Sequence, residues 1–276
     1  MKKYLLNAST VAAIVCMGLT VISCMNKSKA EPVAAAAAIS SVETKTETAV
    51  AEDSGNTLSG YDPSDATAFG LVGPVKKVFT TQYMANLNGN KLQRAERIES
   101  DGNNAMTFNR QGLVTCDIFG SPYTYDSNGK FIKGRNANTQ MERSPRGLIE
   151  KYLHQDNTDG GHWNSYTYEF KYDQEGRMTT YTYTGWEEVF EYAYTYEGDK
   201  VYPSGEEMDG QACADLFKAH ITYRYTKFDE RGNWTEREVY IVEEQGVDTG
   251  VDGGEPEMEI TKTYKIETRK IEYYES

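Results

Sequence analysis

The sequence predicts an all-β protein, an antiparallel meander of hairpins with at most one short helix. Three observations carry this prediction. From residue 73 onward the chain is rich in Tyr, Thr, Val and Ile, which favour strands. Apolar and polar side chains alternate along several segments, and one turn-forming hexapeptide recurs. The sheet is expected to curl into a partial barrel or to form two packed layers, and the sequence does not decide between them.

The N-terminus resembles a bacterial lipoprotein signal. Lys2 and Lys3 precede an apolar run over residues 11–22 that is too short to span a bilayer. The run ends in a lipobox-like sequence formed by Val21, Ile22, Ser23 and Cys24. This resemblance implies that residues 1–23 are a signal peptide and that Cys24 is lipidated, which anchors the mature protein to a membrane. The alternative is an ordinary secretory signal that contains a cysteine.

Residues 24–69 are predicted to form a disordered tether, and residues 70–276 a β domain. The tether is rich in Ala, Ser, Thr and Glu and buries too little apolar surface to offset its ordering entropy. As a flexible coil it would span roughly 35 Å. No acidic cluster follows Met25. By similarity to lipoprotein sorting signals, this favours the outer membrane, with the protein facing the periplasm.

The charge of the chain argues against nucleic acid as a partner. The formal charge is −13, and removal of residues 1–23 takes away two lysines and no acidic residue, which leaves −15. Phosphate binding requires clustered Lys and Arg side chains, which a strongly acidic chain of this kind does not favour. The expected partners are therefore the membrane, through the lipid, and a protein or glycan of the cell envelope.

One hexapeptide recurs along the β domain: an aromatic residue, Asp or Asn, two polar residues, Gly, and a residue that opens the return strand. Four copies begin at Phe108, Tyr125, Tyr172 and Phe228, and two degraded copies begin at Arg143 and Tyr196. The Asp or Asn side chain accepts hydrogen bonds from amides further along the turn, and the Gly adopts the left-handed conformation. Each copy therefore predicts one β-hairpin.

These turns resemble those of the YD-repeat (Rhs-like) family, and more closely those of short Gram-negative lipoproteins of unknown function. Residues 73–78 and 232–237 are similar to the openings and closings of that group. The resemblance covers roughly residues 70 to 276. It implies a β-meander and indicates no activity. The copies are too few to build the large shells of long family members, and their irregular spacing disfavours a strict solenoid or a propeller.

Alternation predicts one broad aromatic face over three neighbouring strands. The residues on that face are Tyr166, Tyr168, Phe170, Tyr172, Tyr181, Tyr183, Phe190, Tyr192, Tyr194 and Tyr196. Residues 209–220 are the one segment expected to be helical, with Cys213, Leu216 and Phe217 facing the sheet as a lid. Near the C-terminus the apolar residues change from even to odd positions, which predicts a β-bulge between Thr268 and Lys270.

Two groups of residues are candidate ligand sites. Trp163 and Trp186, with Tyr181 and Tyr183, could stack on sugar rings. Burial in an aromatic sheet is the stronger explanation for the tyrosines, because their alternation is what burial demands, and the weaker one for the two tryptophans. A second group has side chains that bind metals, but a polar hairpin loop explains it without a metal. That group is His154, Asp156, Asp159 and His162. No metal and no cofactor are therefore expected, and the acidic stretch over residues 243–257 lacks the spacing of a calcium loop.

The sequence carries none of the common catalytic or nucleotide-binding motifs. We therefore expect no intrinsic catalysis, and we expect a membrane-tethered protein-interaction or scaffolding module of the cell envelope. Binding of an envelope or dietary glycan is the first alternative. A hydrolase that uses carboxylates or a metal is the second. Whether Cys116 and Cys213 form a disulfide stays open at this stage.

Overall fold

The computed structural model describes residues 64–99, 104–117, 121–134, 138–155, 165–213, 215–247 and 257–275. The signal sequence, Cys24 and most of the expected tether lie outside these residues. In the part of the chain that is described, no helix is long and apolar enough to cross a membrane.

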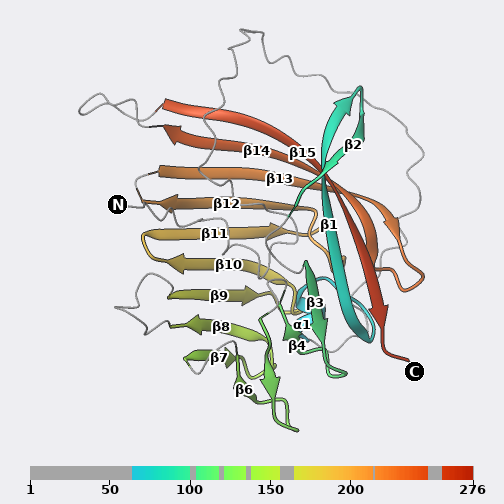
Figure 1. Ribbon diagram of the computed structural model, residues 1–276, viewed down its shortest axis with the longest axis vertical. Helices are drawn as coiled ribbons and strands as arrows, with labels where there is room; N and C mark the ends of the chain where they lie inside the picture. Colours follow the sequence, from blue (N-terminus) through green and yellow to red (C-terminus); the bar gives the residue numbers. More distant parts are fainter. Residues whose placement is uncertain are drawn as a thin grey trace.

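The all-β prediction is confirmed: thirteen strands form one antiparallel sheet, and two more form a small separate sheet (Figure 1). The N-terminal elements are α1 (Asp65–Ala68), β1 (Val75–Asn88), β2 (Lys91–Arg97), β3 (Ala105–Phe108), β4 (Val114–Cys116), β5 (Thr124–Tyr125), β6 (Phe131–Lys133) and β7 (Thr139–Arg143). The remaining strands are β8 (Ile149–His154), β9 (Tyr166–Tyr172), β10 (Met178–Gly185), β11 (Glu188–Thr195), β12 (Gly205–Ala212), β13 (Asp215–Phe228), β14 (Trp234–Val247) and β15 (Glu257–Tyr273).

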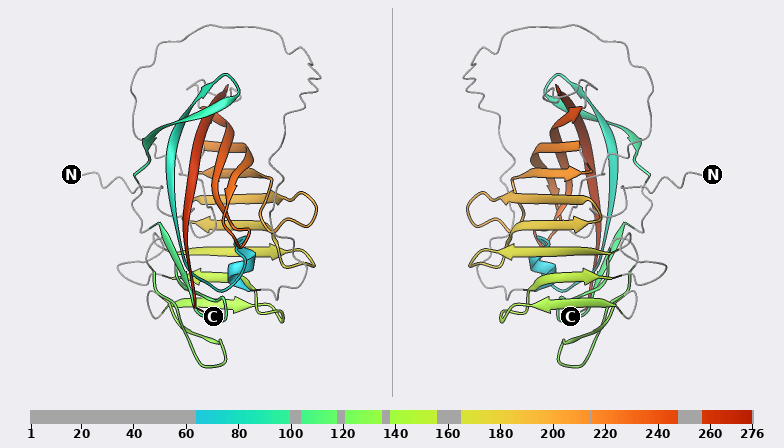
Figure 2. Two further views of the ribbon diagram at one scale, coloured as in Figure 1. Left: turned by 90° about the vertical axis from the view of Figure 1, so that its right-hand side faces the viewer. Right: turned by 90° about the vertical axis from the view of Figure 1, so that its left-hand side faces the viewer.

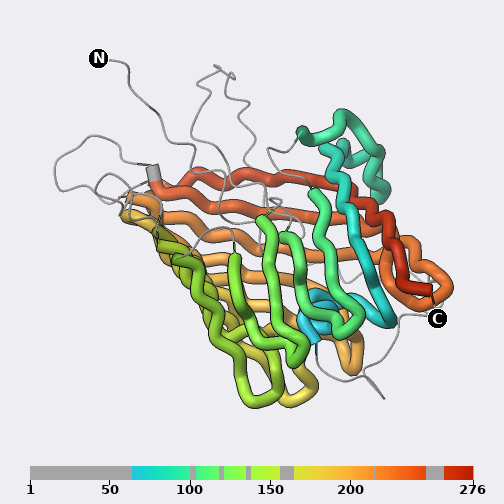
Figure 3. Tube along the Cα trace, turned by 60° about the horizontal axis from the view of Figure 1, so that its bottom comes forward, coloured from blue at the N-terminus to red at the C-terminus, as the bar shows by residue number. Residues whose placement is uncertain are grey.

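The meander runs in sequence order from β7 to β15, and β15 then pairs with β1, the first strand of the domain. The sheet order is β4-β3-β1-β15-β14-β13-β12-β11-β10-β9-β8-β7, and β2 pairs with β1 outside this path. The first strand of the domain therefore pairs with the last, as the cyan and red segments show (Figure 3). The edge strands are β4 and β7.

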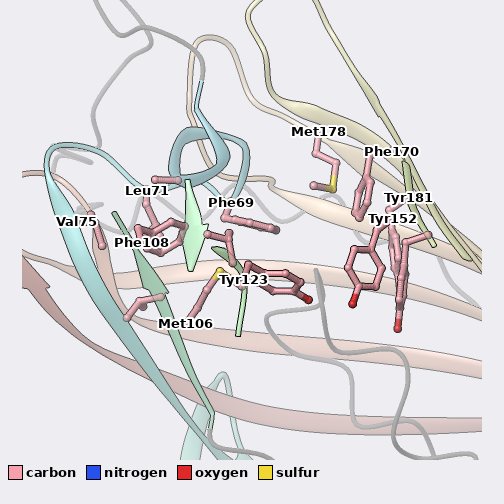
Figure 4. Close-up of a cluster of buried hydrophobic side chains, with 14 of the residues drawn as sticks. Phe69, Leu71, Val75, Met106, Phe108, Tyr123, Tyr152, Phe170, Met178 and Tyr181 are labelled. Atoms are coloured by element: carbon pink, nitrogen blue, oxygen red, sulfur yellow. The ribbon is translucent and has the colours of Figure 1, made fainter. Parts of the chain in front are cut away.

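The sheet curls around one main core and does not close into a barrel. In side view β1 and β15 form one wall, β9 to β11 form the other, and α1 lies between them (Figure 2). The core joins buried residues of β1 and β3 to the aromatic face of β8 to β10, with Phe69 and Tyr123 between the two groups (Figure 4). This burial of apolar surface between the walls is the main stabilising term of the fold.

The recurring hexapeptide forms five hairpins of one design. In each turn the backbone amide of the first residue donates to the carbonyl four residues further on, and the glycine amide donates to the carbonyl of that first residue. The first residues are Asn109, Asp126, Ser144, Asp173 and Asp229. The turn glycines have φ between +78° and +87°. The degraded copy at Arg143 keeps this geometry with a serine. The copy at Tyr196 differs, because it joins β11 to β12 through a longer loop.

The predicted aromatic face is confirmed by the register of β9, β10 and β11. Tyr181 lies opposite Phe170 on one side and Tyr192 on the other. Its ring stacks on that of Tyr192, with centroids 4.8 Å apart. Cross-strand aromatic pairs of this kind each add roughly 0.2–1 kcal/mol over alanine pairs.

The helix expected over residues 209–220 is wrong, since this segment forms the end of β12 and the start of β13. The Phe190 ring on β11 occupies the space over Gly210, where an added Cβ would approach within 2.1 Å of a ring carbon. Cross-strand packing therefore overrides any local helical preference. Phe217 points to the core side, whereas Leu216 is 45% exposed and does not form a lid.

The β-bulge expected between Thr268 and Lys270 is also wrong. β15 pairs with β1 in unbroken register from Lys265 to Glu272, and the irregularity falls on β1 between Val75 and Lys77. From Lys265 to Tyr273 the odd-numbered residues of β15 are buried or partly buried on the inner side of the sheet. Three of them are charged and buried: Lys265, Glu267 and Arg269. The prediction failed because it assumed that the inward face is apolar.

Residues 64–69, assigned from the sequence to the tether, pack into the domain. Ser64 caps α1 by accepting a hydrogen bond from the amide of Thr67. The Asp65 carboxylate accepts a hydrogen bond from the amide of Val114 on β4 at 2.9 Å and pairs with Arg143 on β7 at 2.7 Å. Because β4 and β7 are the two edges of the sheet, Asp65 joins one edge to the other.

Candidate functional sites

The residues proposed from the sequence as a glycan surface do not lie together. Trp186, at the turn between β10 and β11, is 42% exposed. Tyr181 and Tyr183 are instead buried in the core, with 0% and 4% exposure, so they are not part of a ligand surface. Trp163 lies outside the described residues.

His154 is a core residue on β8 and not part of a surface loop. Its ring stacks on that of Tyr166 with centroids 4.8 Å apart, and the side chain is 7% exposed. Asp156, Asp159 and His162 lie outside the described residues. Within the described ranges, no three Asp, Glu, His or Cys side chains are grouped so that they could hold a metal ion.

The two cysteines of the β domain are not bonded to each other. Cys116 on β4 is partly buried, and Cys213 is exposed at the turn between β12 and β13. Burial raises the pKa of the Cys116 thiol, and Asp117 adds to the effect. The thiol therefore stays protonated near neutral pH, which makes it a poor nucleophile.

Several exposed apolar side chains lie on the face opposite the core, at one end of the sheet. This end carries the turns between β10 and β11 and between β12 and β13 (Figure 1). Val189 lies opposite Gln211, and Gln211 lies opposite Leu216. Met258 on β15 lies opposite Gly246 on β14. Gln245, the residue before Gly246, lies opposite Phe217 on β13, which places Met258 close to the level of Leu216. We call Val189, Leu216, Met258 and Ile260, with Trp186 at the adjacent turn, the apolar row. Their side chains are 42–61% exposed.

An acidic row lies beside the apolar row on the same face. Glu191, Asp209, Lys218 and Glu244 follow one another across four strands, and Ile260 ends the line. Lys218 lies 3.8 Å from Asp209, and both side chains are largely exposed. The row therefore holds three carboxylates and one ammonium group.

A second distinctive arrangement lies on the concave face, where three charged side chains are buried together. The Arg237 Nε donates to Glu267 Oε2 at 2.7 Å, and neither side chain is more than 3% exposed. Gln82 Nε2 donates to the other carboxylate oxygen at 2.8 Å. Burial by itself lowers the pKa of Arg237, but Glu267 outweighs it and raises that pKa well above its usual value.

Arg269 lies beside this pair and forms no ion pair with another residue in the part of the chain that the structure describes. Its guanidinium carbon is 3.5 Å from the ring centroid of Trp234, and that of Arg237 lies 4.6 Å from the same ring. Among the described residues, Arg269 Nε and Nη1 are buried and have no hydrogen-bond partner. Burial, with repulsion from Arg237, lowers the pKa of Arg269 well below its usual range.

Both arginines line a cavity of about 40 Å³. Tyr194, Tyr196, Glu206 and Trp234 line it as well. Glu206 is buried and accepts a hydrogen bond from the hydroxyl of Tyr223. We call this space the arginine pocket.

The opening and closing segments noted in the sequence meet next to this pocket. The Asn233 side chain accepts from the amide of Val72 at 2.7 Å and donates to its carbonyl at 2.8 Å. Trp234 and Arg237 follow in the same closing segment. Sequence analysis missed Glu206 and Arg269, which line the pocket, and Glu267, which pairs with Arg237. The available signal was the run of charges at alternate positions of a strand, residues 265, 267 and 269.

Comparison with protein families and with curated proteins gives no relative for this chain. No family model matches it, and no curated protein is significantly similar to it. The function must therefore be argued from the two arrangements just described.

Proposed function

We propose that this protein is a membrane-tethered protein-interaction or scaffolding module of the cell envelope, without intrinsic catalysis. The observation that carries this proposal is the apolar row. Isolated exposed apolar residues are normal on a protein surface, but several gathered on one face are typical of interaction sites. Here the row has members on β11, β13 and β15, with Trp186 at the turn before β11 and with Gln211 on β12 between Val189 and Leu216.

The chemistry of the row favours a partner with apolar side chains flanked by basic ones. The apolar row supplies the area that is removed from water on binding. The acidic row beside it disfavours an acidic partner and attracts Lys and Arg, which sets the orientation of the complex. A second copy of this chain would bring the same carboxylates together and is disfavoured for that reason.

The N-terminal sequence supports a location at a membrane. The lipobox-like residues before Cys24 favour lipid attachment, and the similarity of the turns to those of short envelope lipoproteins agrees with it. The tether would hold the sheet away from the lipid headgroups, where the apolar row can meet a periplasmic or outer-membrane protein.

The test is site-specific photo-crosslinking in intact cells, with the photoreactive residue placed at position 216. We expect one predominant crosslinked protein. For the Leu216→Glu variant the photoreactive residue is placed at position 258, because position 216 is then occupied by Glu. This variant should lose the crosslinked protein. The matched control is Leu87→Glu, since Leu87 is 48% exposed on β1, away from the row. Equal crosslinking in both variants would overturn the proposal.

Glycan binding is the second candidate, and the exposed indole of Trp186 is the observation that favours it. An exposed Trp ring can stack on the apolar face of a sugar. Saturable quenching of tryptophan fluorescence by an envelope glycan, abolished in Trp186→Ala, would support this candidate over a protein partner. Unchanged fluorescence across a glycan panel would remove it.

A further inference from the structure

The arginine pocket contains a buried cation, Arg269, two of whose donors, Nε and Nη1, have no hydrogen-bond partner among the residues that the structure describes. A buried charge without a partner costs several kcal/mol, and buried donors in folded proteins nearly always have a partner. Arg237 cannot relieve Arg269, because its own charge is paired with Glu267 and adds repulsion. Trp234 offers only the face of its ring. The remaining partner for Nε and Nη1 is a group inside the cavity.

We propose that the arginine pocket binds a small monovalent carboxylate, with the two carboxylate oxygens accepting hydrogen bonds from Arg269. The planar guanidinium fork matches a carboxylate in geometry and charge. A cavity of about 40 Å³ suits a group of the size of formate or acetate. This site is on the concave face, so it is separate from the apolar row and independent of the function proposed above.

Glu206 on the wall of the same cavity restricts the ligand further. Its carboxylate already accepts a hydrogen bond from Tyr223, and it repels a second negative charge. A dianion such as inorganic phosphate is therefore disfavoured relative to a monoanion. The aromatic side chains of Tyr194, Tyr196 and Trp234 complete the walls and exclude larger polar groups.

The test is a titration of the mature chain with sodium formate, followed by thermal unfolding and by the fluorescence of Trp234. A ligand that binds only the folded state raises Tm by roughly 5 °C at a hundred-fold excess over Kd for a domain of this size. We expect a saturable rise in the wild type and none in Arg269→Met. Arg224→Met is the control, since Arg224 pairs with Glu238 on the convex face.

Inorganic phosphate at the same ionic strength should give a smaller rise than formate. The same formate response in Arg269→Met as in the wild type, or no saturable response in the wild type, would overturn the proposal. If Arg269→Met fails to fold, a crystal of the wild type soaked in sodium bromide decides the question. An anomalous peak within hydrogen-bond distance of Arg269 Nε or Nη1 is expected, and an ordered water there instead would contradict an anion site.

Discussion

Asp65 connects the two edges of the sheet through a single carboxylate. It accepts from the amide of Val114 on one edge and pairs with Arg143 on the other, and it is 2% exposed. Breaking a buried ion pair by removing one partner leaves an uncompensated charge. The stability of the curled sheet should therefore depend strongly on this one residue, which lies before the domain boundary expected from the sequence.

We predict that Asp65→Asn lowers the free energy of unfolding by about 3–5 kcal/mol. Urea denaturation followed by circular dichroism measures the change. The control is Asp209→Asn, because Asp209 forms a solvent-exposed pair with Lys218 and its loss should change stability very little. Equal effects of the two substitutions would show that Asp65 does not join the edges.

Removal of the Arg269 charge should have the opposite effect on stability to removal of the Asp65 charge. Because its charge is buried and has no ion-pair partner among the described residues, replacement by Met should leave the stability of the ligand-free protein unchanged or raise it. The same denaturation experiment measures this. A loss of several kcal/mol in Arg269→Met would mean that the guanidinium is held by favourable contacts that the present geometry lacks.

Among the elements, the five hairpin turns share one geometry but differ in their surroundings. An added Cβ at Gly112 would lie 2.7 Å from the Oγ of Ser64, and Ser64 is the residue that caps α1. An added Cβ at Gly147 would meet nothing within 4 Å. Both glycines have positive φ. The left-handed conformation alone costs an alanine about 1–2 kcal/mol.

We predict that Gly112→Ala is more destabilising than Gly147→Ala, because it also displaces the cap of α1. The additional loss is about 0.5–2 kcal/mol, the typical value of a helix N-cap. Urea denaturation of the two single variants measures the difference. Equal losses at the two turns would show that α1 does not depend on the turn at Gly112.

Elements whose hydrogen bonds are local could be predicted from the sequence, and those that depend on distant strands could not. The turns at Asn109, Asp126, Asp173 and Asp229 are closed by their own side chains and glycines, so the hexapeptide is sufficient to identify them. The helix expected over residues 209–220 failed because Phe190 on another strand requires Gly210 in extended backbone. The arginine pocket was missed because its residues come from β12, β14 and β15 and meet only in the folded sheet.

At the scale of the whole molecule, the interior of the sheet is rich in buried tyrosines. Burial raises the pKa of Tyr123, Tyr168 and Tyr223 well above the usual value of 10.0. A group whose pKa is raised in the folded state contributes stability that is fully present below the unfolded pKa and is lost as the pH rises above it. The protein should therefore be stable at neutral pH and lose stability above about pH 10.

We predict that the buried tyrosines ionise together with unfolding in one cooperative step above about pH 10. Tyrosinate absorbance and circular dichroism, recorded on the same alkaline titration, should change in parallel. A gradual rise of tyrosinate absorbance with an unchanged dichroism spectrum would contradict the burial of these hydroxyl groups.

The central claim is that the apolar row holds a partner protein at the membrane. The most direct test is native mass spectrometry of the protein, expressed in its own host with the N-terminal signal sequence and extracted from the membrane fraction in a non-ionic detergent. We expect the wild type and Leu87→Glu to carry one protein partner in a fixed ratio and Leu216→Glu to appear without it. The same mass for all three proteins, or a wild type that carries no partner, would contradict the claim.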